Sequence, residues 1–445
     1  MPRSLRDSAE RNFQKALALM KKGQSKEASK VLKKAEEAAV KAEASDLFLY
    51  IQTVKGQLMQ ALGEYEESMK IHFLTIKNTE KLFSEDPYNE LYLPIVQMNL
   101  KSIFTLGNIF HEMGRFPEAK SCYELNLMVF YKLLKIYPEN VVNQSYVAGT
   151  FNNLGALLSD MGRIEEAKYM HEKSLLIYEK LLGTDPKNIE YQSNVSMTLN
   201  NLGVLLSKIG HFEEAKQRYE KALEMREDLL KTDTENASYQ SDVAMTLNNL
   251  GNLLADMGCI EDAKQRHEKA LEIREKLLKA NPERVEYQSA VAMTFNNLGI
   301  MFSDAGHFEE SKQRYEKALE IFEKFLKTDP ENVVYQLDVG MILNNIGLLF
   351  KNMGRIEDAK KRFEEALELR QKLLKIDPEN VMYQLDVETT LNNLGNLFFE
   401  NGQKEEAKEN FEKALEILES LSKKSPENEK LIEEINCMRE KLEEP

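Results

Sequence analysis

The sequence has 445 residues, of which 42% are hydrophobic and 30% are charged, and its formal net charge at pH 7 is −15. This composition is typical of a soluble, largely helical protein, and no stretch approaches the ~18 consecutive apolar residues of a membrane span. The three cysteines, Cys122, Cys259 and Cys437, lie far apart. Their spacing excludes a disulfide framework and a thiolate zinc site, and it predicts a cytoplasmic protein.

The charge is unevenly distributed along the chain. Residues 1–45 carry a net charge of +5, and the remainder carries −20. Because an acidic surface repels a phosphate backbone, we expect no nucleic-acid binding. The basic segment is either an electrostatic contact or, as we favour, a solvated helix face. The first residues lack the apolar core of a secretory signal, so we expect none.

Two irregular units come first in the chain. Residues 1–46 form a basic, divergent helix pair with a turn at Gly23, and residues 47–94 form a second divergent pair with a turn at Gly63. We predict them as the first two members of a repeat array.

Residues 95–430 then form seven units with a period of 48 residues. The clearest mark is the segment from Tyr191 to Gly203, which recurs without insertion at 239–251, 287–299, 335–347 and 383–395. Length alone would suggest about three domains. Self-similarity at a fixed period predicts one array instead.

Each regular unit is predicted to contain two helices. In one unit, helix A runs from about residue 191 to 209 and helix B from about 212 to 230, because apolar residues recur there every three or four positions. Gly210 is predicted to end helix A in a left-handed turn. Asp-Pro-Glu-Asn sequences such as 329–332 stop helix B, because proline cannot continue a helix. Residues 431–445 are predicted to be a capping helix.

A second glycine lies inside helix A, at Gly203 for example, although glycine there costs about 1 kcal/mol relative to alanine. We interpret it as a close approach to small residues of helix B, Ala215 and Ala222. Because one helix pair cannot bury both of its sides, each unit must stack on the next. The predicted fold class is all-α: an α-solenoid (right-handed superhelix) of about nine antiparallel helix pairs with a C-terminal capping helix.

These residues resemble the tetratricopeptide repeat. The landmarks of that motif in helix A, the turn and helix B are matched by Leu202, Gly203, Leu206, Gly210, Ala215, Tyr219 and Ala222. The unit of 48 residues is longer than the usual 34, and the aromatic residue usual early in helix A is often leucine, as at Leu199. The Leu-Asn-Asn-Leu run before a long helix B is similar to kinesin light-chain repeats. The resemblance implies a concave groove, lined by helix A, that holds peptides.

Helical geometry, at about 100° per residue, separates two faces of helix A. Leucines such as Leu202 face helix B, and the opposite face carries an asparagine and a methionine three residues before it. The candidate binding residues on this face are Asn152, Asn200, Asn248, Asn296, Asn344, Asn392, Met197, Met245, Met293 and Met341. An asparagine can pair with both polar groups of a peptide backbone, and methionine adds adaptable apolar contact.

Bonds and packing between units are the alternative for both rows. We favour them for the second asparagine of each pair, such as Asn201, and for the methionines, and we leave the two roles open for the first asparagine. The positions at which the units differ are expected to determine which partner is bound. Asn252 and Asn396 follow the helix glycine, and Asp160, Asp256 and Asp304 come five residues after it. These residues favour a groove for neutral-to-basic segments, or else they form a solvated acidic edge.

No motif predicts catalysis. The chain lacks a phosphate-binding glycine loop, a Gly-x-Ser-x-Gly elbow and a His-Glu-x-x-His sequence. His171 and His267 occupy helix B positions that are aromatic in other units, which favours packing. We therefore expect no enzyme, no cofactor and no metal. The predicted function is a scaffold that binds a protein or peptide partner, without membrane insertion; the alternative is a structural element that associates with itself.

Overall fold

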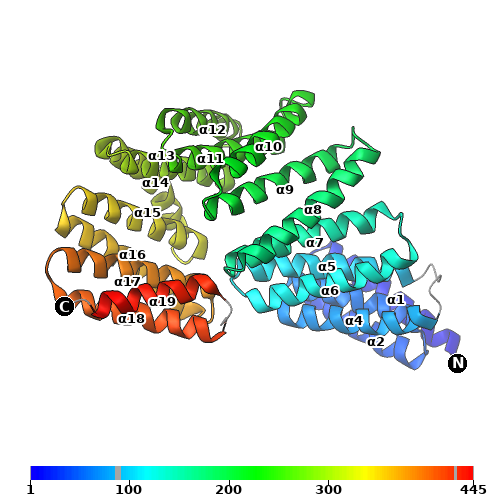
Figure 1. Ribbon diagram of the computed structural model, residues 1–445. Coiled ribbons are helices and arrows are strands. Elements are labelled where there is room, and N and C mark those ends of the chain that lie inside the picture. The colour runs from blue at the N-terminus through cyan, green and yellow to red at the C-terminus, as the bar shows by residue number, and fades with distance from the viewer. Residues whose placement is uncertain (1, 86–91, 425–427, 444–445) are drawn as a thin grey trace. The chain divides into compact units, whose positions relative to one another are not determined.

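The computed structural model describes residues 2–85, 92–424 and 428–443. Over these residues the chain forms nineteen α-helices and no strand (Figure 1). The helices follow one another as pairs, and α19 remains at the C-terminal end. The predicted all-α solenoid of helix pairs with a capping helix is confirmed. The chain divides into two compact units, residues 1–154 and 155–445.

Unit 1 holds the two divergent helix pairs and the first regular one. Its helices are α1 (Pro2–Lys21), α2 (Ser25–Lys41), α3 (Ser45–Ala61), α4 (Tyr65–Glu85), α5 (Tyr92–Glu112), α6 (Phe116–Ile136) and the first part of α7 (Val141–Asp160). Phe13 on α1, Leu32 on α2 and Val54 on α3 belong to one buried apolar cluster. The divergent pairs therefore stack on each other through apolar side chains, as repeats in an array must.

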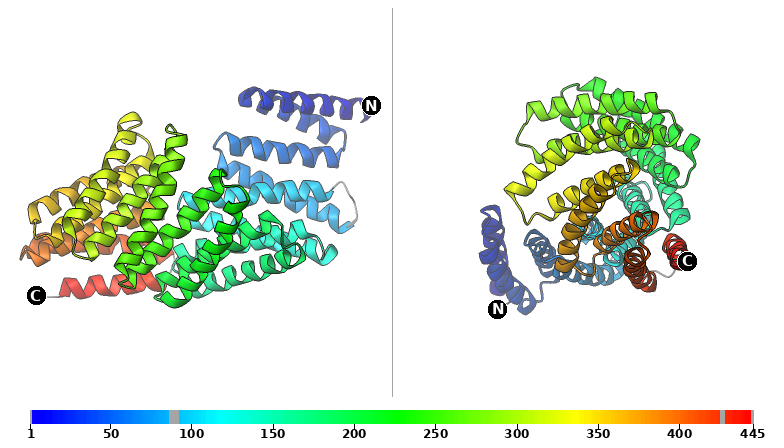
Figure 2. Two further views of the ribbon diagram at one scale, coloured as in Figure 1. Left: turned by 90° about the horizontal axis from the view of Figure 1, so that it is seen from above. Right: turned by 90° about the vertical axis from the view of Figure 1, so that its left-hand side faces the viewer.

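Unit 2 holds the most regular repeats. Its helices are the end of α7, α8 (Ile164–Thr184), α9 (Ile189–Lys208), α10 (Phe212–Thr232), α11 (Ala237–Asp256), α12 (Ile260–Ala280), α13 (Val285–Asp304), α14 (Phe308–Thr328), α15 (Val333–Asn352), α16 (Ile356–Ile376), α17 (Val381–Glu400), α18 (Lys404–Lys424) and α19 (Glu429–Glu443). From α8 to α19 each helix packs on the next along the chain (Figure 2). The first helices of successive pairs, α9 to α17, also contact one another, whereas the second helices in the described part of unit 2 have no comparable contacts. The first helices therefore form the more closely spaced layer.

The turns explain why the helices begin and end where they do. Gly210 adopts φ +76°, and the next residue, His211, donates its N–H to the carbonyl of Leu206 at 2.9 Å. This is the Schellman ending that a glycine permits. At the other end of the repeat, the side chain of Asn332 caps α15 by accepting the N–H of Tyr335 at 3.3 Å. The final residue of the Asp-Pro-Glu-Asn sequence thus starts the next helix as an N-cap.

The sequence suggested that the mid-helix glycines face small residues of the second helix. The structure shows that they face large rings instead. A Cβ atom on Gly203 would lie 2.7 Å from a ring carbon of Tyr219, and one on Gly347 would lie 2.6 Å from the ring of Phe363. The same position of the second helix carries a histidine in other pairs, such as His267 opposite Gly251. The glycine therefore makes room for a buried ring, and the expectation that Ala215 and Ala222 explain it is wrong.

The C-terminal helix closes the array. Leu431, Ile435 and Met438 are buried on the face of α19 that packs on α18. The start of α19, Glu429, lies 48 residues after the start of α17, so α19 occupies the position of a further first helix. Among the described helices, α15 is long and apolar enough to cross a membrane, but 56% of its apolar window is buried inside the array.

Candidate functional site on the first helices

The sides of the first helices that are turned away from their partner helices form what we call the inner face. In α9 this face contains Met197, Asn201, Val204 and Lys208, and it contains the equivalent residues of α11, α13, α15 and α17 and of the part of α7 that lies in unit 2. Lys208 is exposed and the other three are half-buried, whereas Leu202 is buried against the second helix. The inner face is therefore the accessible surface that all these helices share.

The first asparagines lie at the edge of this face and are mostly buried. Their exposed fractions are 2% for Asn152, 3% for Asn200, 7% for Asn248, 3% for Asn296 and 5% for Asn344, while Asn392 is half-buried. The sequence leaves two roles open for these residues, a peptide contact or a bond between units. The structure places most of each side chain between neighbouring repeats.

Hydrogen bonds between repeats explain this burial. The Nδ2 atom of Asn249 donates to Oδ1 of Asn200 at 3.2 Å, and Asn393 donates in the same way to Asn344 at 3.0 Å. A third such bond joins Asn345 to Asn296 at 2.8 Å. The second asparagine of one repeat thus satisfies the carbonyl of the first asparagine in the preceding repeat. The bond uses only the oxygen of the first amide. The first asparagine can therefore link two repeats and still offer its nitrogen to a ligand.

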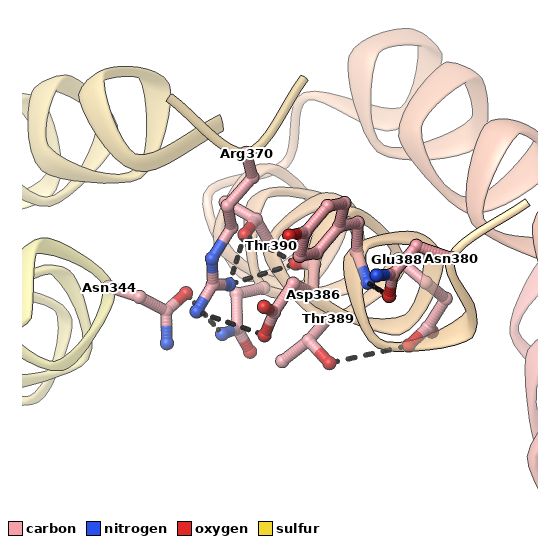
Figure 3. Close-up of polar contacts among 9 residues, drawn as sticks. Asn344, Arg370, Asn380, Asp386, Glu388, Thr389 and Thr390 are labelled. Atoms are coloured by element: carbon pink, nitrogen blue, oxygen red, sulfur yellow. Dashed lines mark hydrogen bonds and ion pairs between the residues drawn. The ribbon is translucent and has the colours of Figure 1, made fainter. Parts of the chain in front are cut away.

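The other end of these amides remains available. Within the described part of the chain, the Nδ2 atoms of Asn200, Asn248 and Asn344 donate to no side chain or backbone group. Figure 3 shows the Nδ2 atom of Asn344 clear of the contacts around it. The inter-repeat bond fixes which end of the amide is free, since a carboxamide has one acceptor and one donor end.

The ladder changes at two positions. Asn248 does not accept from the next repeat; its Oδ1 lies 3.3 Å from Nδ1 of His267. At the C-terminal end, Nζ of Lys441 donates to Oδ1 of Asn392 at 3.0 Å and to Oδ1 of Asn396 at 3.1 Å. Lys441 stands 48 residues after Asn393, so it takes the place of a second asparagine.

The four methionines of the row differ in how far they are buried. Met293 and Met341 are half-buried against the apolar core of the repeats, as the packing alternative predicts. Met197 is also half-buried, and Met245 is 37% exposed. Near Met245, Asn252 and Ile300 are exposed as well. The inner face therefore has its most accessible apolar surface on α11 and α13.

Carboxylates form a row near the C-terminal ends of the first helices. Asp160 is paired with Lys208 at 3.5 Å, and Lys351 is paired with Glu400 at 2.7 Å. Asp256 and Asp304, on the adjacent helices α11 and α13, are exposed and have no basic partner among the described residues. Burial raises the pKa of both carboxyls, and the charge of Asp256 raises the pKa of Asp304 further.

A buried arginine linking adjacent repeats was missed by the sequence analysis. Arg370 of α16 is 5% exposed and donates to the carbonyl of Asp386 at 2.8 Å and to Oγ1 of Thr390 at 2.6 Å (Figure 3). Burial lowers the pKa of the guanidinium, and the nearby Asp386 carboxylate counteracts this shift. The contact holds α16 against α17.

The signal for this contact is an arginine in the second helix with a threonine twenty residues later. It occurs in the pairs Arg226 with Thr246, Arg274 with Thr294 and Arg370 with Thr390. Another regular step has Phe322 with Ile342, both fully buried, whereas Phe130 with Thr150 and Tyr178 with Thr198 combine the threonine with an aromatic residue. In these steps arginine at this position always accompanies threonine, but threonine also occurs without arginine.

The two histidines in helix B positions, His171 and His267, are buried packing residues. His171 and His267 are 2% and 0% exposed, and burial lowers the pKa of each to about 4. Over the residues that the structure describes, no group of three or more histidine, cysteine, aspartate or glutamate side chains is placed to hold a metal ion. The candidate site is thus a surface of amides, methionines and carboxylates.

Several solved structures are similar to this chain, and the first of those that follow supports the fold. A Rap protein complexed with Competence and Sporulation Factor is similar over 94% of this chain and 99% of its own, with 14% identity and a TM-score of 0.52. The apo form of RapI is similar over 73% of this chain and 99% of its own, with 16% identity and a TM-score of 0.49. BtubC (BKLC) from P. vanneervenii has 24% identity over 58% of this chain and 92% of its own, with a TM-score of 0.41. No match was found among curated proteins.

The sequence profile of the tetratricopeptide repeat matches residues 9–39, 146–228, 242–324 and 338–420. These segments make up more than half of the chain and cover repeats in both units. The described helices pair and stack as the repeat requires. The chain therefore belongs to the tetratricopeptide repeat family.

Proposed function

We propose that this protein is a non-catalytic interaction scaffold that binds an extended segment of a partner protein along the inner face of unit 2. The observation that carries the proposal is the row of free amide donors. Asn200, Asn248 and Asn344 are each more than nine-tenths buried, yet their Nδ2 atoms donate to nothing among the described residues. Solvent reaches each of these nitrogens, so a ligand carbonyl can accept a hydrogen bond from it in place of water.

The spacing of the donors suits an extended chain. Packed helices lie ~8–10 Å apart and an extended peptide rises ~3.3 Å per residue, so one amide would meet roughly every third residue. Because Oδ1 of Asn200 and Asn344 already accepts from the next repeat, the donors recognise carbonyls only. Such contacts are independent of the side chains of the partner. Met245 and Ile300 supply the accessible apolar contacts beside them.

The solved complex of a Rap protein with Competence and Sporulation Factor suggests the same class of function, because that fold is similar over nearly the whole chain. We also propose a cytoplasmic location; unpaired Cys122, Cys259 and Cys437 are compatible with a reducing compartment. The alternative, a structural element that associates through its ends, is less favoured. The apolar end of the last repeat is already covered by Leu431, Ile435 and Met438 of α19.

Selection from a random library of twelve-residue linear peptides on the immobilised protein tests the proposal. The triple variant N200D, N248D and N344D retains an acceptor oxygen at each site and removes the free donor. We expect selected peptides to bind it at least tenfold more weakly than wild type, since each neutral hydrogen bond contributes about 1 kcal/mol. Circular dichroism checks that the helices are intact.

The matched control adds the same three charges elsewhere. Gln217, Gln265 and Gln313 are exposed on the second helices α10, α12 and α14, and the variant Q217E, Q265E and Q313E should bind the selected peptides like wild type. Equal affinity of the peptides for the asparagine variant and wild type would refute the role of the amides. Failure to select any linear peptide would favour the self-associating alternative, which analytical ultracentrifugation would then examine.

A further inference from the structure

We infer that the segment bound on the inner face is cationic, and that it places an arginine or lysine side chain between Asp256 of α11 and Asp304 of α13. This inference rests on the proposed function and adds the chemistry of the partner. It combines three observations on the inner face of α11 and α13: two carboxylates without a basic partner, an amide with a free donor, and exposed apolar side chains.

The distribution of charge singles out this pair within the carboxylate row. Lys208 neutralises Asp160 at one end of the row, and Lys351 neutralises Glu400 at the other. Between them, the repulsion between Asp256 and Asp304 is not relieved by any basic side chain of the described chain. A cation placed between two such carboxylates would remove their mutual repulsion and gain attraction from both.

The second observation is the free amide of Asn248. Its side chain is 7% exposed, and its Oδ1 lies 3.3 Å from His267. Its Nδ2 atom has no partner in the described part of the chain. Met245 and Asn252, three residues before and four residues after it, are both exposed. Residues at these spacings share one side of a helix, so Asn248 opens onto the same inner face as the carboxylates.

The distance between the two features selects a long side chain. Asn248 precedes Asp256 by eight residues, which corresponds to ~12 Å along the axis of α11. A peptide carbonyl bound to Asn248 would therefore lie too far from Asp256 for a short cationic side chain. Arginine and lysine are long enough when extended, and their apolar stems would cross the exposed Ile300. Arginine has the further advantage that its planar fork can bond to two carboxylates.

Peptide pools that differ at one residue test the inference. Four pools of eleven-residue peptides have random uncharged residues around a fixed centre, which is arginine, its neutral isostere citrulline, the short cation diaminopropionate, or glutamate. Retention on immobilised wild-type protein is measured by quantitative mass spectrometry. We expect the arginine pool to be retained about tenfold more than the other three, and the difference to shrink at high salt.

Two variants locate the effect. D256N with D304N should abolish the preference for arginine over citrulline. The matched control E220Q with E268Q neutralises two exposed glutamates on the second helices α10 and α12, and it should keep the full preference. A lysine pair, D256K with D304K, should shift the preference to the glutamate pool.

The outcomes separate this inference from the proposed function. Equal retention of all pools by wild type, or an arginine preference that survives D256N with D304N, would overturn the cationic segment. If wild type retains all pools equally and the triple variant N200D, N248D and N344D retains none, the inner face remains the binding surface and only the cationic segment is refuted. Retention of no pool by wild type would overturn both.

Discussion

The side-chain Nδ2 of Asn249 donates to Oδ1 of Asn200, 49 residues earlier in the chain, across 3.2 Å. The bond connects the first helices of two adjacent repeats, α11 and α9, and it orients the amide of Asn200. Asn249 therefore links the two repeats, and its bond leaves the Nδ2 atom of Asn200 free for the proposed ligand. The two residues are neighbours only because the chain advances one whole repeat between them.

The first prediction concerns this bond. The variant N249A should leave the buried Oδ1 of Asn200 without a donor and reduce the local stability of the α9–α11 contact by about 1–3 kcal/mol. Hydrogen–deuterium exchange of the backbone amides in α9 and α11 measures this local opening. N297A is the matched control, because Nδ2 of Asn297 donates to no described residue and its Oδ1 accepts only a long bond of 3.5 Å from Asn296. An equal loss in both variants would show that the bond contributes nothing.

The second prediction concerns pH. His267 is fully buried, its Nε2 meets no hydrogen-bond partner among the described residues, and its pKa is lowered from 6.5 to about 4. Because the unfolded state then binds a proton more readily, stability should fall as the pH drops from about 6.5 to 4. The loss attributable to His267 at pH 5 should be about 2 kcal/mol.

The repeat itself supplies the replacement residue for this test. Phe363 occupies the position of His267 in a later repeat, opposite the same glycine. The variant H267F should therefore fold and weaken the pH dependence of amide exchange in α11 and α12. H211Q, at an exposed position where Gln403 stands in another repeat, should retain the dependence of wild type. An unchanged pH dependence in H267F would contradict a neutral buried imidazole.

The third prediction concerns the arginine contact between repeats. T390I should destabilise the α16–α17 contact by about 1–3 kcal/mol, because the buried Arg370 loses the Thr390 hydroxyl. The double variant R370F with T390I recreates the Phe322 and Ile342 pair of another step, and it should recover stability to within about 1 kcal/mol of wild type. Urea unfolding and amide exchange measure both. If the double variant is as unstable as the sum of the two single variants, the residues are not coupled.

The fourth prediction concerns the C-terminal cap. K441A should remove the donor to Asn392 and Asn396 and increase amide exchange in α19, with a local loss of about 1 kcal/mol. K441N should recover part of that loss, because asparagine in this register donates to the preceding repeat elsewhere, as Asn393 does to Asn344. Identical exchange in K441A and K441N would mean that the amide register does not extend into α19.

Local sequence signals are sufficient to predict the helix pairs and the capping helix of this protein. The 48-residue period, the turn glycine at Gly210 and the proline-containing turns predict the helix pairs, because they act through local backbone conformation. The apolar face of residues 431–445 likewise predicts the cap, since a helix with one apolar side must bury it.

Tertiary structure decided what the repeated side chains do. The sequence shows that Asn200 and Asn249 recur but not that the oxygen of one is taken by the other while its nitrogen stays free. It shows acidic residues at Asp160, Asp256 and Asp304, but only the structure shows that Asp160 is paired and the other two are not. Hydrogen bonds and ion pairs depend on distances between residues that are one repeat apart, and a repeat pattern fixes which residues recur without fixing those distances.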